Sequence, residues 1–240
     1  MKYLPWIAVC ALALAGCTDR EAERQAQAAA MAQANEQKAA ELEKRYEQAV
    51  QSSNWDMARA FGADLLQTYP QSEAAKRVEP GYAQVKAKGD EARNQRRLQA
   101  LWQYNQIAVK GGTQRSAMID AKERVDVDGS GAKNVQLVFR DHPQWKRHAY
   151  LVLRAGDFKC YSGCKVQVSM DGGKPKAMAA HRPDTDEAIA MFIDDQNALF
   201  KLAKQSKATL AIEFPVKAGG TRTAVFETGG LDATQLPGWE

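Results

Sequence analysis

The spacing of apolar residues changes once along this chain, from a helical period in the first half to strand-like alternation in the second. From Arg20 to about Val50 the sequence is mostly Ala, Gln, Glu, Lys and Arg, with very few turn-forming residues. Leu42, Tyr46 and Val50 follow at four-residue steps, which places them on one helical face. We therefore expect residues 17–50 to form a polar helical tether that buries an apolar face only near its end.

The next block, residues 51–110, carries its own helix start and stop signals. Ser53-Asn54 offers an N-cap, and Tyr69-Pro70-Gln71-Ser72 ends one helix and caps the next. Between these signals, apolar residues recur at helical steps: Trp55, Ala58, Phe61, Leu65 and Leu66. The pattern predicts two consecutive helices.

The stretch from Tyr46 to Val78 resembles one tetratricopeptide-type helical hairpin of the kind found in periplasmic lipoproteins and assembly factors. A single repeat cannot bury both of its faces, so the resemblance implies a packing neighbour. The simplest neighbour is a helix from about Glu91 to Gln106, which would carry Leu98, Leu101, Trp102 and Ile107. A small helical bundle is favoured over a longer repeat array.

Beyond Gly111-Gly112 apolar and polar residues alternate, as in strands with one buried face. The expected strands are 116–125, 134–140, 147–154, 164–170, 209–214 and 221–227, separated by Gly-rich and Asp-Gly turns. One helix, beginning at Asp194 or Asp195, carries Leu199 and Phe200. The predicted fold is α+β: an N-terminal helical segment, then an antiparallel β-sandwich-like domain with one helix over residues 113–240.

Several short segments of this half occur in an order that resembles small periplasmic β-domains. A cysteine-bearing strand pair comes first, then Phe200-Lys201-Leu202-Ala203-Lys204 before a strand, and finally Val225-Phe226-Glu227-Thr228 with Gly229-Gly230-Leu231-Asp232. The families that share this order are the invasion-associated-locus-B-like and type VI secretion-associated proteins. The resemblance implies an envelope accessory or stress-related role, and it supplies no catalytic residues.

The N-terminus combines Met1-Lys2 with an apolar run from Leu4 to Ala15, which is typical of a secretory signal and too short for a membrane span. Leu14-Ala15-Gly16-Cys17 resembles the lipobox of bacterial lipoproteins. That resemblance implies cleavage of residues 1–16, diacylglycerol on the Cys17 thiol and an acylated amino terminus. Each buried methylene contributes about 0.8 kcal/mol, so several chains would hold the protein on a bilayer.

The residue after the lipidated cysteine determines sorting in the usual Gram-negative pattern, where an aspartate there favours the inner membrane. This chain has Thr18 at that position and Asp19 one place later. We therefore expect an outer-membrane lipoprotein that faces the periplasm. Asp19 keeps the inner membrane as the alternative.

Composition and motifs argue against several classes of function. The formal net charge is only +4 and both signs are spread along the chain, which gives no case for a nucleic-acid partner. No residue set requires a cofactor. No serine lies in a G-x-S-x-G nucleophile elbow.

Cysteine usage predicts a disulfide. Cys10 would leave with the signal and Cys17 would carry lipid, so Cys160 and Cys164 would be the remaining thiols in an oxidising compartment. We expect them to pair around Tyr161-Ser162-Gly163 and to present that loop for binding. A redox or metal site is the alternative, but the spacing matches neither C-x-x-C nor a four-ligand set.

Other candidate ligand sets are weaker. Asp126, Asp128 and Ser130 match the first, third and fifth positions of a calcium loop, but the twelfth position is Leu137, so a polar hairpin turn is favoured. His142 and His148 flank Pro143, whose turn argues against a shared zinc ion. The remaining motifs are His181-Arg182-Pro183, expected in a solvated loop or a docking edge, and Trp145, the first aromatic candidate for binding.

The sequence thus favours a non-enzymatic envelope lipoprotein that is anchored by its lipid and binds a protein of the envelope. A second interpretation is a periplasmic inhibitor or immunity lipoprotein whose disulfide loop blocks a cell-wall-active enzyme. A third is an enzyme that acts on cell-wall or lipid material through Asp and His residues that are scattered along the chain. A deep pocket that pairs His148 or His181 with a carboxylate would favour the enzyme.

Overall fold

The computed structural model describes residues 15–183 and 189–239, with side chains from residue 20 onward. The predicted signal segment, the lipidation of Cys17 and part of the loop after Pro183 therefore lie outside what it describes. The fold is α+β, as predicted, with helices followed by an antiparallel sheet and one further helix. The chain divides into a helical unit up to Arg93 and a β-rich unit from Asn94.

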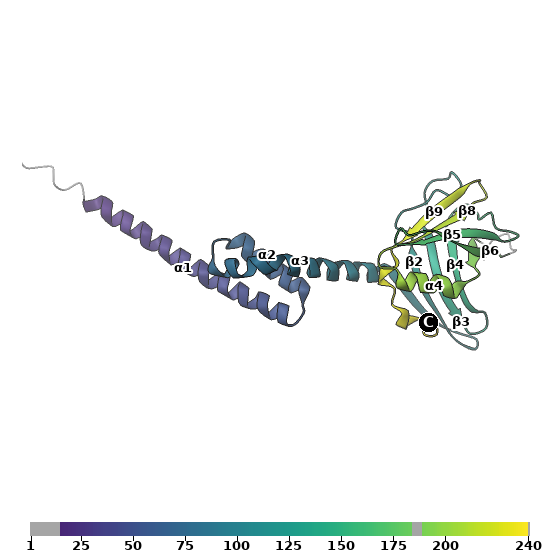
Figure 1. Cartoon of the computed structure of the whole chain (residues 1–240), viewed down its shortest axis with the longest axis horizontal. Helices are drawn as coiled ribbons and strands as arrows, with labels where there is room; N and C mark the ends of the chain where they lie inside the picture. Colours follow the sequence, from purple (N-terminus) through teal and green to yellow (C-terminus); the bar gives the residue numbers. More distant parts are fainter. Residues whose placement is uncertain (1–14, 184–188, 240) are drawn as a thin grey trace, which may run out of the picture. The chain divides into compact units, whose positions relative to one another are not determined.

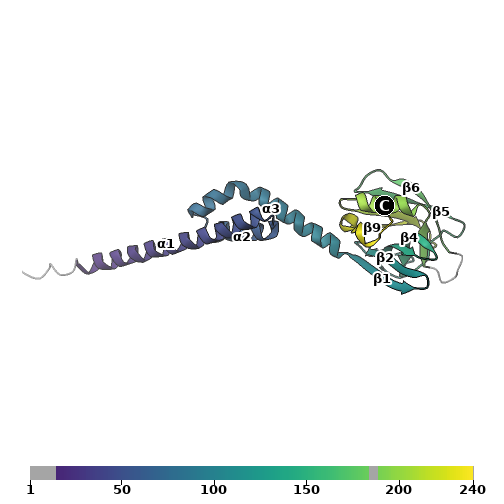
Figure 2. The ribbon, with the colours of Figure 1, turned by 90° about the horizontal axis from the view of Figure 1, so that it is seen from below.

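Three helices make up the N-terminal half: α1 (Ala15–Gln51), α2 (Trp55–Thr68) and α3 (Glu73–Ala100). Within the helical unit, α2 lies beside the second half of α1 in both views (Figures 1 and 2). The predicted cap of α2 is present, since the backbone N–H of Met57 donates to Oδ1 of Asn54 at 3.3 Å. Small and medium apolar residues form the core of this unit: Ala39, Tyr46, Ala49, Ala58, Leu65, Ala74, Ala75, Val78 and Val85.

The third helix ends earlier than the sequence predicts. α3 stops at Ala100, and β1 (Trp102–Val109) pairs with β2 (Gly112–Asp120), so the predicted helix to Gln106 is wrong. Gly111-Gly112 forms the turn of this hairpin, with φ angles of 93° and 144° that favour glycine. The predicted boundary at these glycines therefore lies inside the β-rich unit, which also includes about the last two turns of α3.

In the part of the chain that the structure describes, nine strands form one sheet in the order β1-β2-β3-β4-β7-β6-β5-β8-β9, with every neighbouring pair antiparallel. The remaining strands are β3 (Val135–His142), β4 (Lys146–Leu153), β5 (Cys164–Met170), β6 (Lys176–His181), β7 (Ala190–Ile193), β8 (Leu210–Pro215) and β9 (Thr221–Phe226).

The sheet curves strongly, so that its edge strand β9 returns toward the segment that follows β2 (Figure 1). The backbone N–H of Lys122 donates to the carbonyl of Val225 at 2.7 Å across this junction. The predicted sandwich is thus a single sheet folded over its core, in keeping with the twist of antiparallel strands.

Aromatic side chains fill the concave face of the sheet. α4 (Gln196–Gln205) closes this face, and Asp195 caps it by accepting from the N–H of Ala198 at 2.9 Å, as predicted. Phe200 of α4 packs against Phe139 of β3 and Trp239 near the C-terminus, with ring centroids 5.1 and 5.0 Å apart. Because the inner positions alternate with outer ones, the same strands present a second set of side chains to solvent.

Candidate binding site at the disulfide corner

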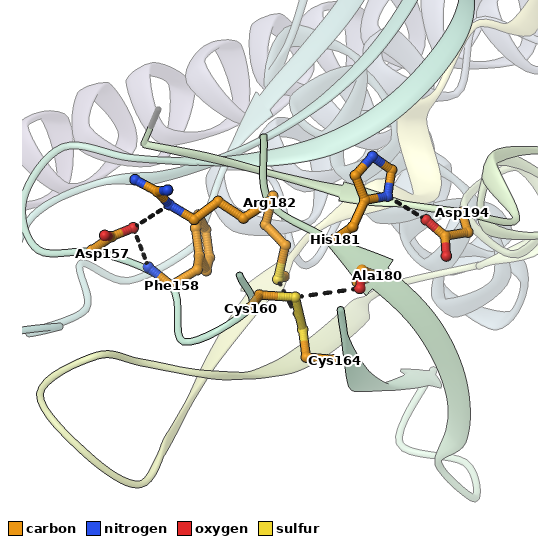
Figure 3. The surroundings of a disulfide bond; sticks show 9 residues. Asp157, Phe158, Cys160, Cys164, Ala180, His181, Arg182 and Asp194 are labelled. Carbon is orange, nitrogen blue, oxygen red and sulfur yellow. Dashed lines mark hydrogen bonds and ion pairs between the residues drawn. A yellow bond between two sulfur atoms is a disulfide. The ribbon is translucent and has the colours of Figure 1, made fainter. Parts of the chain in front are cut away.

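The predicted disulfide is present. Cys160 and Cys164 are bonded, with their Cα atoms 5.1 Å apart, in the connection between β4 and β5 (Figure 3). Cys160 is buried and its Sγ lies 3.3 Å from the carbonyl oxygen of Ala180 on β6. Cys164 opens β5, where it pairs in register with Ala180. The bond therefore fastens the incoming chain at the point where β5 begins and its antiparallel partner β6 ends.

The three residues inside the disulfide ring, Tyr161, Ser162 and Gly163, are exposed. Gly163 has a φ of 84°, a left-handed conformation that favours glycine, and its N–H donates to the carbonyl of Cys160 at 3.3 Å. The side chain of Tyr161 is 50% exposed. The predicted binding loop is thus a tight turn with one aromatic ring at the surface.

An ion pair behind the loop fixes Tyr161. Nε of Arg182 donates to Oδ1 of Asp157 at 2.8 Å, and the hydroxyl of Tyr161 donates to Oδ2 of the same carboxylate at 2.5 Å. The guanidinium of Arg182 also lies 4.3 Å from the centre of the Tyr161 ring, within cation–π distance. Figure 3 shows Arg182 reaching toward Asp157 beside the disulfide. We call these residues with the disulfide loop the disulfide corner.

The arginine of this network is far more buried than the sequence predicts. His181-Arg182-Pro183 was expected in a solvated loop, but His181 ends β6 and the side chain of Arg182 is only 2% exposed. Burial alone would raise the pKa of Asp157, but hydrogen bonds from Tyr161 and Arg182 and the guanidinium charge lower it below its usual range. The sequence around Arg182 and Pro183 gives no signal for this burial, because the carboxylate that pairs with Arg182 lies in a different connection between strands.

Replacement of Arg182 tests how much the fold depends on its ion pair with Asp157. Arg182→Ala is expected to lower the free energy of unfolding by about 3 kcal/mol near neutral pH, since it leaves the Asp157 carboxylate partly buried without its counterion. Because the pKa of Asp157 is lower in the folded state, its ionised form stabilises the wild type at pH values above the unfolded-state pKa of about 4. This stabilisation is lost as the pH falls below that value. Urea unfolding at pH 7 and pH 3 should therefore show a smaller deficit at pH 3. An equal loss of unfolding free energy at both pH values would contradict this role of Arg182 as the counterion of Asp157. An equal loss in the control variant Arg154→Ala would contradict it as well.

The other predicted binding residue, Trp145, lies elsewhere. It occupies the turn between β3 and β4, at the opposite end of β4 from the disulfide corner, and it is 60% exposed. Its ring stacks on buried His142 at 4.0 Å, and Nδ1 of His142 accepts from the backbone N–H groups of Gln144 and Trp145. The structure therefore places the two predicted binding elements, the Tyr161 loop and Trp145, at separate parts of the surface. The sequence alone does not show whether they lie together.

One histidine meets a carboxylate. Nδ1 of His181 lies 2.6 Å from Oδ1 of Asp194, but the two side chains are 54% and 49% exposed, on the outer surface of β6 and β7 (Figure 3). This pair therefore lies on the open surface and not in a deep pocket.

The calcium-like segment forms the polar turn that the sequence favours. Asp126 accepts from the N–H of Gly129 at 2.7 Å, and Asp128 accepts from the N–H of Ser130 at 2.9 Å. Within residues 15–183 and 189–239, no group of three or more His, Cys, Asp or Glu residues is arranged to hold a metal ion.

No helix in the described part of the chain combines the length and the apolar character that crossing a membrane requires.

Comparison with known proteins gives a weak structural similarity. No protein-family model matches the chain, and no curated protein matches it. The chain is similar to the crystal structure of invasion associated protein B from Bartonella henselae, with a TM-score of 0.35 and 15% identity. The similarity covers 54% of this chain and 84% of the other.

Proposed function

We propose that this protein is an acyl-anchored lipoprotein of the outer membrane that faces the periplasm and binds another envelope protein without catalysing a reaction. The lipobox-like Leu14-Ala15-Gly16-Cys17 supports the anchor. The disulfide of Cys160 and Cys164 fits an oxidising compartment. The β-rich unit supplies the binding surface in this proposal.

The disulfide corner is the observation that carries the proposal. A disulfide that closes so small a ring stabilises the fold by less than the roughly 3 kcal/mol expected for a fifteen-residue loop. A buried ion pair adds little net stability, because its charges lose their hydration. Both features nevertheless converge on the single exposed ring of Tyr161. They fix the shape and position of a surface loop, which reduces the entropy that the loop would lose on binding.

The helical unit has a spacing role in this proposal. α1 contains the proposed lipid site Cys17 near its start, and the 35 residues from Cys17 to Gln51 would reach about 52 Å as a straight helix. Its residues from Arg20 to Lys38 are exposed and mostly polar or small, as expected for a segment that crosses an aqueous space. A lipidated chain of this kind can hold its β-rich unit away from the membrane surface.

Site-specific photo-cross-linking tests the binding role. A photo-reactive residue in place of Ser162, in the full lipidated chain in cells, should give one discrete cross-linked protein. The matched control carries the same residue in place of Lys174, which is exposed in the turn at the other end of β5. Failure to cross-link at position 162, or the same product from both positions, would argue against recognition by this loop.

The inhibitor role is the second candidate, and the exposed Tyr161 loop favours it specifically. A rigid loop that presents one aromatic residue is suited to enter the cleft of an enzyme. The same experiment separates the two roles. A cross-linked cell-wall hydrolase whose activity falls when the purified protein is added would identify an inhibitor, whereas a partner with unchanged activity would identify an accessory protein.

A further inference from the structure

Aromatic and basic side chains gather on the outer face of β3, β4 and β7. Because Phe139, Ala149 and Met191 point into the core, their sequence neighbours point outward. Arg140 pairs in register with His148, and Tyr150 pairs with Phe192. The cationic-aromatic face consists of these four residues with Trp145 and His181: Arg140, Trp145, His148, Tyr150, His181 and Phe192.

The rings of this face touch one another in a continuous series. Phe192 lies at the centre, with ring centroids 5.1 Å from Tyr150, 5.3 Å from His148 and 5.5 Å from His181. The guanidinium carbon of Arg140 lies 5.3 Å from the centre of the Tyr150 ring and 5.5 Å from that of Trp145. Two aromatic rings therefore hold the arginine on the outer surface of the sheet.

Arg140 has no counterion among the described residues. Its Nε makes no hydrogen bond although that atom is shielded from solvent, and Nδ1 of the neighbouring His148 is unpaired in the same way. Two carboxylates of the same strands have other partners: Asp141 lies 3.8 Å from Nε of Arg147, and Asp194, just after β7, lies 2.6 Å from Nδ1 of His181. A guanidinium that is partly desolvated by aromatic rings and lacks an acid partner strongly favours an incoming anion.

We infer that the cationic-aromatic face binds an acidic, partly apolar segment of a protein partner, with a carboxylate of that segment on the guanidinium of Arg140. Trp, Tyr and Arg are the residues that dominate the binding energy of protein interfaces. A lipid surface is instead bound by clusters of Lys and Arg, whereas this face has one arginine among rings. The face is a second surface, so this inference does not rest on the disulfide corner.

The test uses the soluble chain from residue 18 onward and two short fluorescein-labelled peptides. One contains leucine and glutamate, and the other has glutamine at every glutamate position. Fluorescence polarisation at neutral pH should show roughly tenfold tighter binding of the glutamate peptide, the size expected for a hydrogen bond to a charged group. Arg140→Gln should abolish this preference. Arg140→Lys should retain only part of it, because the ammonium cannot make the bidentate contact.

Two controls make the outcome decisive. Arg154→Gln removes an exposed arginine just beyond the other end of β4 and should leave the preference unchanged. Trp145→Ala should weaken the binding of both peptides and lower the preference only in part, since the Tyr150 ring still holds Arg140. Thermal unfolding of each variant confirms that it is folded. The inference is overturned if the glutamate peptide does not bind, if folded Arg140→Gln keeps the preference, or if only phosphatidylglycerol vesicles bind in an Arg140-dependent way.

Discussion

The Cys160→Ser, Cys164→Ser double variant is expected to stay folded while it loses the cross-link from position 162. The disulfide ring spans a sequence separation of only 4, so its loss should lower the free energy of unfolding by less than about 3 kcal/mol. Cys160 belongs to the main core around Phe139 and Phe200, and Cys164 packs against it, but Tyr161, Ser162 and Gly163 lie outside that core. The released loop would instead sample many conformations, and binding would then have to order it.

Circular dichroism and urea unfolding measure the first part of this prediction, and the photo-cross-linker in place of Ser162 measures the second. Tyr161→Ala with the disulfide intact is the matched control, because it removes the ring and keeps the loop closed. It should also lose the cross-link if the ring is recognised. A globally unfolded double variant, or one that cross-links as well as the wild type, would show that the bond has another role.

Most of the sheet is predictable from alternation, and the exceptions have physical reasons. β5 begins and ends at the predicted residues, and β2, β3, β4, β8 and β9 differ from their predictions mainly at the ends. β1 is missed because Leu98, Leu101 and Trp102 continue the helical spacing of α3 across its true end at Ala100. No Gly or Pro marks that end, so the local pattern cannot distinguish the two structures.

β6 and β7 are missed for a different reason. Lys176–His181 has alanine at three of its six positions, and Ala190–Ile193 has only four residues, so neither gives a clear alternation. Their position in the middle of the sheet comes from pairing with β4 and β5, which are distant in sequence. Tertiary pairing therefore decides these strands.

Some features of the candidate sites can be predicted from local sequence, and others depend on contacts between residues far apart in the chain. The bond between Cys160 and Cys164 follows from compartment and count, and the exposure of Tyr161 follows from a short polar loop. The buried ion pair of Arg182 and Asp157 has no local signal, since 25 residues separate its members. The setting of Arg140 likewise depends on the register of β3, β4 and β7.

Cys17→Ser is expected to move essentially all of the protein from the membrane fraction to the soluble fraction, or to leave it unprocessed. The proposed anchor consists of acyl chains whose buried methylenes contribute about 0.8 kcal/mol each, so two or more chains make release negligible and their loss removes the attachment. Cell fractionation with immunoblotting measures the redistribution. Mass spectrometry of the wild-type N-terminal peptide should show a mature terminus at Cys17 that carries the acyl groups.

Two variants of the next residue provide the controls. Thr18→Ser keeps the cysteine and should leave both lipidation and the outer-membrane position unchanged. Thr18→Asp should keep the lipid but move the protein to the inner membrane, because an aspartate after the lipidated cysteine favours retention there. An unmodified wild-type terminus would refute the anchor itself. Inner-membrane localisation of the wild type, with lipid present, would refute only the predicted destination and would indicate that Asp19 is the residue that is read.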